Sequence, residues 1–178
     1  MTDFLSLAAE GGFSHCAQLC MAAAVPRREV RGMCAADRCG KWGRCWSCPP
    51  ACGTLEQAAS RIARFDRGIL VQSTAKLADD FDYDGIQALS RTHARRFAAL
   101  ARQMRLLCTR TLPLSAGPCL VCRRCTCPDR PCRYPSRRIS AMEAYGLLVS
   151  DVCVRSGLAY NYGPGTMTYT SCILYSEE

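Results

Sequence analysis

The sequence has very little histidine and lysine. Its 178 residues include only two histidines. Lys41 and Lys76 are the only lysines, so that almost all of the positive charge comes from arginine. Because so few histidines are present to act as ligands, we expect any metal site to be built from thiolates alone. No apolar stretch approaches the roughly 20 residues that a membrane-spanning helix needs.

Familiar catalytic motifs are missing as well. The sequence has no glycine-rich loop for phosphate, no pairing of histidine with a carboxylate and no nucleophile elbow. The start, Met1-Thr2-Asp3-Phe4, lacks the basic segment and the apolar run of a signal peptide. We therefore expect a cytoplasmic protein outside the membrane, and the motifs indicate no particular reaction.

Cysteine is the residue type in excess, with 15 copies. Five cysteines lie between Cys34 and Cys52, and five more lie between Cys119 and Cys132. In a cytoplasmic chain such a density indicates metal binding rather than disulfides. Sites made only of sulfur select iron–sulfur clusters or zinc.

The second group has the more specific spacing. Cys119, Cys122 and Cys125 form a C-x₂-C-x₂-C core, which suits three corners of a cubane cluster. We expect Cys132 as the fourth ligand, in preference to Cys127, which is only two positions after Cys125. Zinc usually binds two separated C-x₂-C pairs, so the triplet favours iron–sulfur and leaves zinc as the alternative.

The first group is less clear, because five cysteines compete for at most four positions. A Cys-Pro-Pro sequence begins at Cys48, and its two prolines stiffen the exit of the loop. The candidate ligands of both groups, for two [4Fe–4S] clusters, are Cys34, Cys39, Cys45, Cys48, Cys119, Cys122, Cys125 and Cys132.

Three motifs together resemble a bacterial and archaeal family of predicted metal-binding proteins of unknown function. They are Cys34…Cys39-Gly-Lys-Trp-Gly…Cys48-Pro-Pro, Ala116-Gly-Pro-Cys-x-x-Cys-x-x-Cys…Pro131-Cys-Arg-x-Pro, and Ser140-Ala-Met-Glu-Ala-Tyr-Gly. The resemblance spans roughly residues 13 to 175 and implies metal binding without a reaction. It supports Cys34, Cys39 and Cys48 in the first loop and Cys119, Cys122, Cys125 and Cys132 in the second. Cys45, Cys52 and Cys127 are additions outside the family pattern.

The formal net charge is +8. Two all-cysteine [4Fe–4S] clusters would each add about −2 and bring the loaded protein to about +4. We expect the arginines near the second group to offset this cluster charge. A solvated face is the second reading, and a surface for nucleic acid or an acidic partner is the third. These arginines are Arg123, Arg124, Arg130, Arg133, Arg137 and Arg138.

The composition, 49% hydrophobic and 21% charged, is that of a globular protein. We expect one compact α/β domain over residues 1–178, with a small sheet, flanking helices and metal loops at 34–52 and 117–135. The order helix, strand, cysteine loop, helix, strand occurs twice, so a pseudo-duplication is possible. The patterns predict helices at 2–10, 54–65, 86–107 and 140–156, strands at 13–21, 68–73, 109–114 and 166–175, and an irregular segment at 25–52.

Several residues have a structural explanation. His93 lies on the apolar face of the long helix, so we expect it to pack in the core. Ser140 and Glu143 have the spacing of a capping box that opens a helix. We expect the cysteines outside the two groups to be small buried hydrophobes. These are Cys16, Cys20, Cys108, Cys153 and Cys172.

Three functions remain open. The first is a protein with two iron–sulfur clusters, one of which has an open iron for a substrate or a sulfur ligand. The second is a ferredoxin-like electron carrier with both clusters fully ligated, which would need a redox partner. The third is a zinc-stabilised module that binds nucleic acid or protein through its arginines, and nucleic acid is the partner we expect least.

Overall fold

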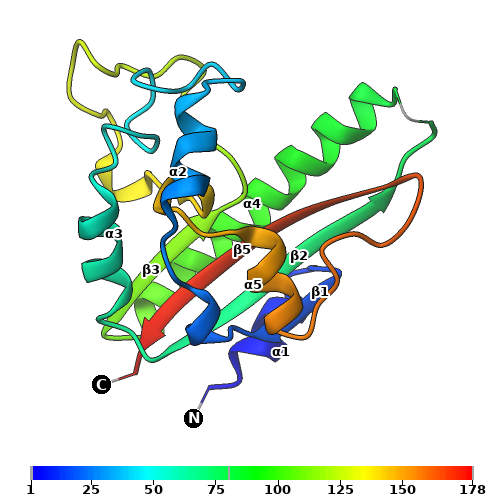
Figure 1. The fold of residues 1–178 in the computed structure, drawn as a ribbon. Helices are drawn as coiled ribbons and strands as arrows, with labels where there is room; N and C mark the ends of the chain where they lie inside the picture. Colours follow the sequence, from blue (N-terminus) through cyan, green and yellow to red (C-terminus); the bar gives the residue numbers. More distant parts are fainter. Residues whose placement is uncertain (1, 80, 178) are drawn as a thin grey trace.

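A five-stranded mixed sheet forms the centre of the fold, with the strand order β1-β2-β5-β3-β4. The computed structural model describes residues 2–79 and 81–177 (Figure 1). The central strands β2 and β5 pair antiparallel along their length, from Arg67 opposite Tyr175 to Lys76 opposite Thr166. The strands are β1 (His15–Gln18), β2 (Arg67–Lys76), β3 (Arg110–Ser115), β4 (Ser140–Ala141) and β5 (Thr166–Ser176).

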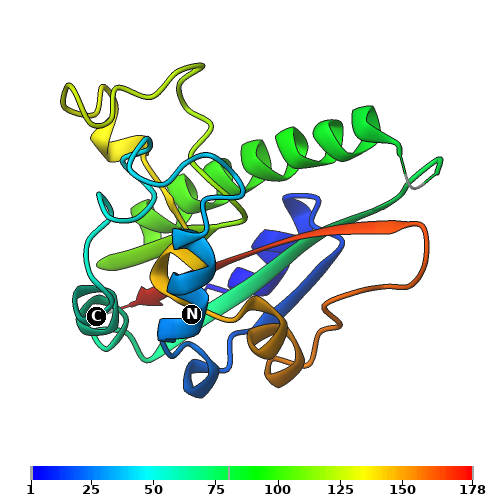
Figure 2. The same cartoon turned by 45° about the horizontal axis from the view of Figure 1, so that its top comes forward.

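Helices cover both faces of the sheet (Figures 1 and 2). Helices α1 (Phe4–Glu10) and α4 (Tyr83–Leu107) pack on one face. Helices α3 (Leu55–Ile62) and α5 (Val149–Arg155) pack on the other. The α/β class predicted from the sequence is therefore confirmed. Within the described residues, no helix combines the length and the apolar character needed to cross a bilayer.

Successive residues of the central strands enter two different cores. Ile69 and Val71 contact the cluster that contains Phe97 of α4. Leu70, between them, contacts the cluster that contains Val152 of α5. Because side chains alternate along a strand and helices cover both faces here, consecutive residues from Ile69 to Val71 are all apolar. This explains the continuous apolar run that predicted β2.

His93 packs in the core, as the helical pattern predicts, and is only 2% exposed. Its Nδ1 lies 2.9 Å from the Ser73 hydroxyl oxygen, and its Nε2 lies 2.7 Å from that of Ser171. Burial lowers the pKa of His93 to about 4, and the nearby charge of Arg96 acts in the same direction. The ring is therefore held neutral between two hydroxyl groups.

The helix predicted over residues 140–156 is wrong in its first half. Ser140 and Ala141 pair with β3 as β4, and a short 3₁₀ turn, η3 (Glu143–Tyr145), follows. Gly146 then has φ +77°, and a Cβ there would lie 2.6 Å from Leu55 Cδ2. The chain turns at this glycine, and α5 begins only at Val149. Ser140 and Glu143 are thus not a capping box.

Other differences are local. The irregular segment predicted at 25–52 contains a helix, α2 (Arg28–Ala35), in which Val30 is the only buried residue. One buried residue is too weak an apolar stripe to reveal a helix. Asp3, rather than Thr2, caps α1 by accepting hydrogen bonds from two backbone N–H groups. The first strand is shorter than predicted, because only His15–Gln18 pair with β2.

The two halves of the chain share one arrangement. Each half runs helix, strand, cysteine-containing segment, helix, strand, and equivalent helices cover the same face: α1 with α4, and α3 with α5. The antiparallel pairs β1–β2 and β3–β5 meet through β2 and β5. This order is what the suggested pseudo-duplication requires. Helix α2 is the clearest addition to the first half.

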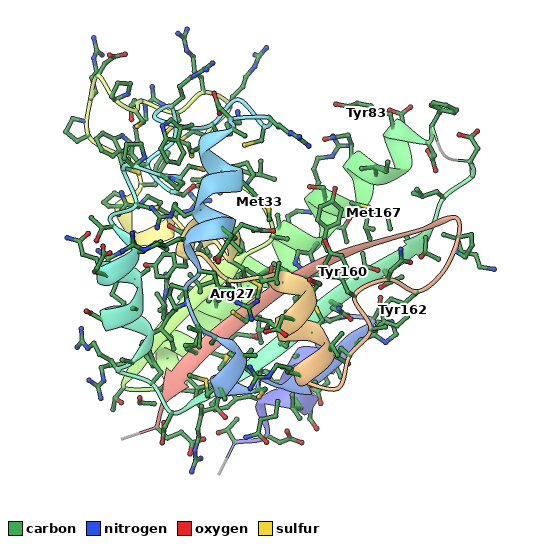
Figure 3. All side chains as sticks on the ribbon, in the orientation of Figure 1. Arg27, Met33, Tyr83, Tyr160, Tyr162 and Met167 are labelled. Carbon is green, nitrogen blue, oxygen red and sulfur yellow. The ribbon has the colours of Figure 1, made fainter. Side chains whose placement is uncertain are left out.

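Arg27 and Tyr162, both labelled in Figure 3, hold the connections around α5 in place. Arg27, just before α2, forms an ion pair with Asp151 of α5. Tyr162, between α5 and β5, donates a hydrogen bond of 2.7 Å to the buried Gln72. The Tyr162 ring also stacks on His15, with ring centroids 4.1 Å apart. Both histidines therefore belong to the framework of the fold.

We expect the His93→Gln variant to lose much of the pH dependence of stability between pH 6.5 and 4. In this window the unfolded chain protonates the imidazole and the folded chain does not. The free energy of unfolding of the natural protein therefore falls as the pH falls, by up to about 3 kcal/mol from this residue. Glutamine keeps polar groups near both serines but does not titrate.

Anaerobic urea unfolding at pH 7 and pH 4.5 measures the effect. The His15→Gln variant is the matched control, because it retains His93 and should keep the dependence of the natural protein. Equal pH slopes for His93→Gln and the natural protein would contradict the prediction.

Candidate metal centre

The two cysteine loops lie side by side, although about 70 residues of sequence separate them (Figures 1 and 2). The Ser47 hydroxyl accepts a hydrogen bond of 3.1 Å from the Cys119 N–H. The Trp46 indole N–H donates to the Arg130 carbonyl at 3.0 Å. The Cys127 thiol donates to the Gly43 carbonyl at 3.5 Å. Three contacts of different chemistry thus join the first loop to the second.

Helix α2 brings the first loop beside the second loop. β1 and β3 are antiparallel to each other, because each step along β1-β2-β5-β3 reverses the direction. The segments that follow β1 and β3 therefore leave the sheet at opposite ends. Figure 1 shows α2 running back along the sheet, so that the first loop ends beside the second.

All four candidate ligands of the second loop line one cavity, and a cysteine of the first loop joins them. The cavity is narrow, about 20 Å³. Ser47 and Tyr134 complete part of its wall. The structure therefore places thiols from both loops around one space. They are Cys45, Cys119, Cys122, Cys125 and Cys132.

Two other thiols of the first loop, Cys34 and Cys52, lie beside η3. The Cys34 thiol donates to the Glu143 carbonyl, and the Cys52 thiol donates to the neighbouring Ala144 carbonyl, both at 3.7 Å. Burial raises the pKa of Cys34, and the charges of Glu143, Cys39 and Cys52 add to this effect. Cys34, Cys39 and Cys52 are thus close enough to influence one another.

Cys45 and Cys48 are tightly coupled. Hydrogen bonding from Cys48, and from Ser47 and Cys125, lowers the pKa of the Cys45 thiol to about 5, against the effect of burial. The same contact raises the pKa of Cys48, because a second negative charge beside Cys45 is disfavoured. The contact between the two thiols therefore favours the thiolate form at Cys45 and the neutral thiol at Cys48.

The donor set suits a soft metal, because thiolates are the preferred ligands of iron–sulfur clusters and zinc. Yet no group of three or more His, Cys, Asp or Glu side chains in residues 2–79 and 81–177 is arranged to hold a single metal ion as it stands. A tetrahedral zinc site would need four thiolates about 2.3 Å from one ion. The thiols converge without forming that cage, so a bound metal would require the loops to adjust.

The arginines of the second loop have no acidic partner within the described residues. One of the guanidinium groups bonds within the loop, since Arg133 donates to the Arg124 carbonyl at 3.0 Å. The Arg138 charge also acts on Cys52, where it opposes the increase in pKa that burial causes. The positive charge around the thiols is therefore uncompensated by carboxylates. It comes from Arg123, Arg124, Arg130, Arg133, Arg137 and Arg138.

Residues 18–175 match a family described as "Predicted metal-binding protein (DUF2284)". The chain belongs to this family. The match includes both cysteine loops and the 3₁₀ turn that contacts Cys34 and Cys52, and membership supports metal binding as a class of function. The family description specifies neither the metal nor a reaction. Neither a curated protein nor a solved structure matches the chain.

Two residues that contact the candidate ligands were not proposed as part of the site from the sequence. Ser47 is fully buried and contacts three cysteines through one hydroxyl group. Its position between Cys45 and Cys48 is the only signal available, and that signal does not distinguish it from any loop serine. Glu143 contacts Cys34 through its backbone carbonyl, so its residue type does not determine the contact.

We expect Ser47→Ala to lower both stability and metal content. The Cys119 N–H would lose its acceptor, and leaving such a group unpaired costs about 1–3 kcal/mol. Anaerobic denaturant unfolding and metal analysis of the purified variant measure the two effects. Ser60→Ala, at an exposed position of α3, is the control and should match the natural protein. A Ser47→Ala variant with unchanged stability and metal content would show that the loops meet without this hydrogen bond.

Proposed function

We propose that the two loops bind iron–sulfur clusters. The observation that carries this proposal is the cavity lined by five thiols, four from the second loop and Cys45 from the first. Neither histidine lines this cavity: His93 is bonded to two serines in the core, and His15 is stacked on Tyr162. A site limited to thiolates, with a C-x₂-C-x₂-C core, is typical of iron–sulfur clusters.

The second cluster would be held by Cys119, Cys122, Cys125 and Cys132. Cys45 is then a fifth thiol at the edge of the same cavity. The arginines around the loop would offset the negative charge of a thiolate-bound cluster, since no acidic side chain within the described residues neutralises them. This uncompensated charge supports a cluster more than a neutral thiol cavity.

The first cluster would be held by Cys34, Cys39 and Cys48, which leaves one iron without a protein ligand. An iron with a free position supplies Lewis acidity to an oxygen or sulfur atom of a substrate. The chain's own part is to hold the three thiolates and to exclude water. Cys48 is buried, and the backbone at Glu143 and Ala144 fixes the neighbouring thiols.

An electron carrier is the second candidate. Cys45 and Cys52 are both buried beside the first group, and either thiol is near enough in the loop to complete its ligation. With four protein ligands at each cluster, no iron would be open. The protein would then exchange electrons with a redox partner rather than bind a small-molecule substrate.

A reducing compartment such as the cytoplasm suits either candidate. All 15 cysteines are free thiols in the structure. Such a chain would form disulfides in an oxidising compartment, whereas cytoplasmic thiols stay reduced. We therefore keep the cytoplasm as part of the proposal. The alternative to iron–sulfur clusters is a zinc-stabilised module that binds nucleic acid or protein. Metal analysis distinguishes the two.

The protein purified without oxygen should be brown and should contain iron and acid-labile sulfide in similar amounts. Replacing Cys119 by serine should remove about half of this iron and destabilise the fold, since metal binding contributes folding free energy. The measurements are iron and sulfide assays with the visible spectrum.

Cys108→Ser is the control for this experiment. Cys108 follows the last residue of α4 and packs against the apolar cluster that contains Phe97. This variant should leave the iron content unchanged. Colourless protein with stoichiometric zinc, after expression in iron-replete anaerobic cells, would replace the iron–sulfur proposal by the zinc alternative.

The variants Cys45→Ser and Cys52→Ser decide between an open and a closed first cluster. If the first cluster has an open iron, both variants should keep the full iron content. Added cyanide or a small thiol should then change the spectrum of one reduced cluster and spare the other. Loss of a cluster in either variant, with no response to cyanide in the natural protein, would favour the electron carrier.

A further inference from the structure

A cavity of about 570 Å³ lies between α4 and the first residues of the second cysteine loop. This volume is within the range of small-molecule sites. In Figure 1 the segment that follows β3 passes beside the middle of α4, and its residues form one wall. Phe97 and Ala98 of α4 face Ala116, Pro118 and Ile139. The interior is therefore mainly apolar.

Three arginines give this cavity its charge. Arg91 and Arg95 come from α4, and Arg137 comes from the second loop. No acidic residue lines the cavity, and none of the three arginines forms an ion pair within the described residues. Arg95 makes one long hydrogen bond of 3.4 Å to Thr92, and Arg137 stacks on Tyr134. Their remaining N–H groups are free to bind a carboxylate, sulfonate or phosphate group.

His93 also lines the cavity, where its ring forms part of the wall and has no free nitrogen for acid–base chemistry. Both of its nitrogens are already paired with serine hydroxyls. The polar groups of the cavity that can bind a ligand are thus concentrated in the arginines. A ligand that matches this lining has an apolar body and an anionic group.

The cavity adjoins the thiols. Cys119 and Val121 line both this cavity and the thiol-lined cavity, so they form a wall between the two spaces. We propose that the larger cavity binds a small organic anion with an apolar body, beside the second metal site. The part of this inference that places the ligand next to a metal rests on the proposed function. Binding of the anion itself does not.

Two related fluorescent dyes test the proposal on the full chain. 8-Anilinonaphthalene-1-sulfonate has an apolar body and a negative charge, and N-phenyl-1-naphthylamine has nearly the same body without the charge. We expect the sulfonate to bind at one saturable site per chain. Arg91→Gln combined with Arg95→Gln should weaken this binding about tenfold or more, because charge-assisted hydrogen bonds are lost, and should leave the neutral dye unaffected.

The double variant Arg64→Gln with Arg102→Gln is the matched control. It removes the same charge from exposed positions that do not line the cavity, and it should bind the sulfonate normally. The proposal is overturned if the sulfonate shows no saturable site. It is also overturned if the two dyes bind alike in every variant, or if both double variants weaken binding equally.

Iron and zinc are measured on the same samples, so that the two proposals fail separately. Arginine-dependent binding by a colourless zinc protein would keep the anion site and reject the clusters. Iron-replete protein that fails to bind the sulfonate would keep the clusters and reject the anion site.

Discussion

The hydrogen bond between Ser47 and the Cys119 N–H marks the constraint on which the candidate site depends. The sheet by itself sends the two cysteine loops to opposite ends, because β1 and β3 are antiparallel. Helix α2 carries the first loop back, and the Ser47 hydroxyl joins it to the second. Without that return path, the five thiols of the narrow cavity would not share one space.

Charge and shape are distributed unevenly around this junction. Four thiols of the two loops are buried, the arginines lie around the second loop, and the ion-paired acidic residues lie outside that loop. An arginine-rich surface favours the approach of anions. The apolar cavity next to Cys119 would then select among those anions by shape. Arg137 belongs to both sets of arginines, the set around the second loop and the set that lines the larger cavity.

Much of the framework could be predicted from the sequence, because strong periodic patterns identify β2, α4 and β5, and a true capping box begins α3 at Thr54. The helix at 140–156 was wrong because the Ser140–Glu143 spacing imitates a cap, whereas Gly146 turns the chain. Helix α2 was missed because it buries only Val30. The spacing identified the candidate ligands, but it did not predict which of these cysteines lie together in the folded chain. Cys45 lies with the second loop, and that contact depends on tertiary structure rather than on local sequence.

The position of β5 has a consequence for how the protein is made. This strand is the last element in chain order, yet it lies at the centre of the sheet between β2 and β3. A ribosome therefore releases every cysteine of both loops before the strand that organises the sheet has been synthesised. The thiols would spend that interval on an incomplete scaffold, exposed to oxidation and to the wrong metal. Synthesis where oxygen is low would keep these thiols reduced until the sheet is complete.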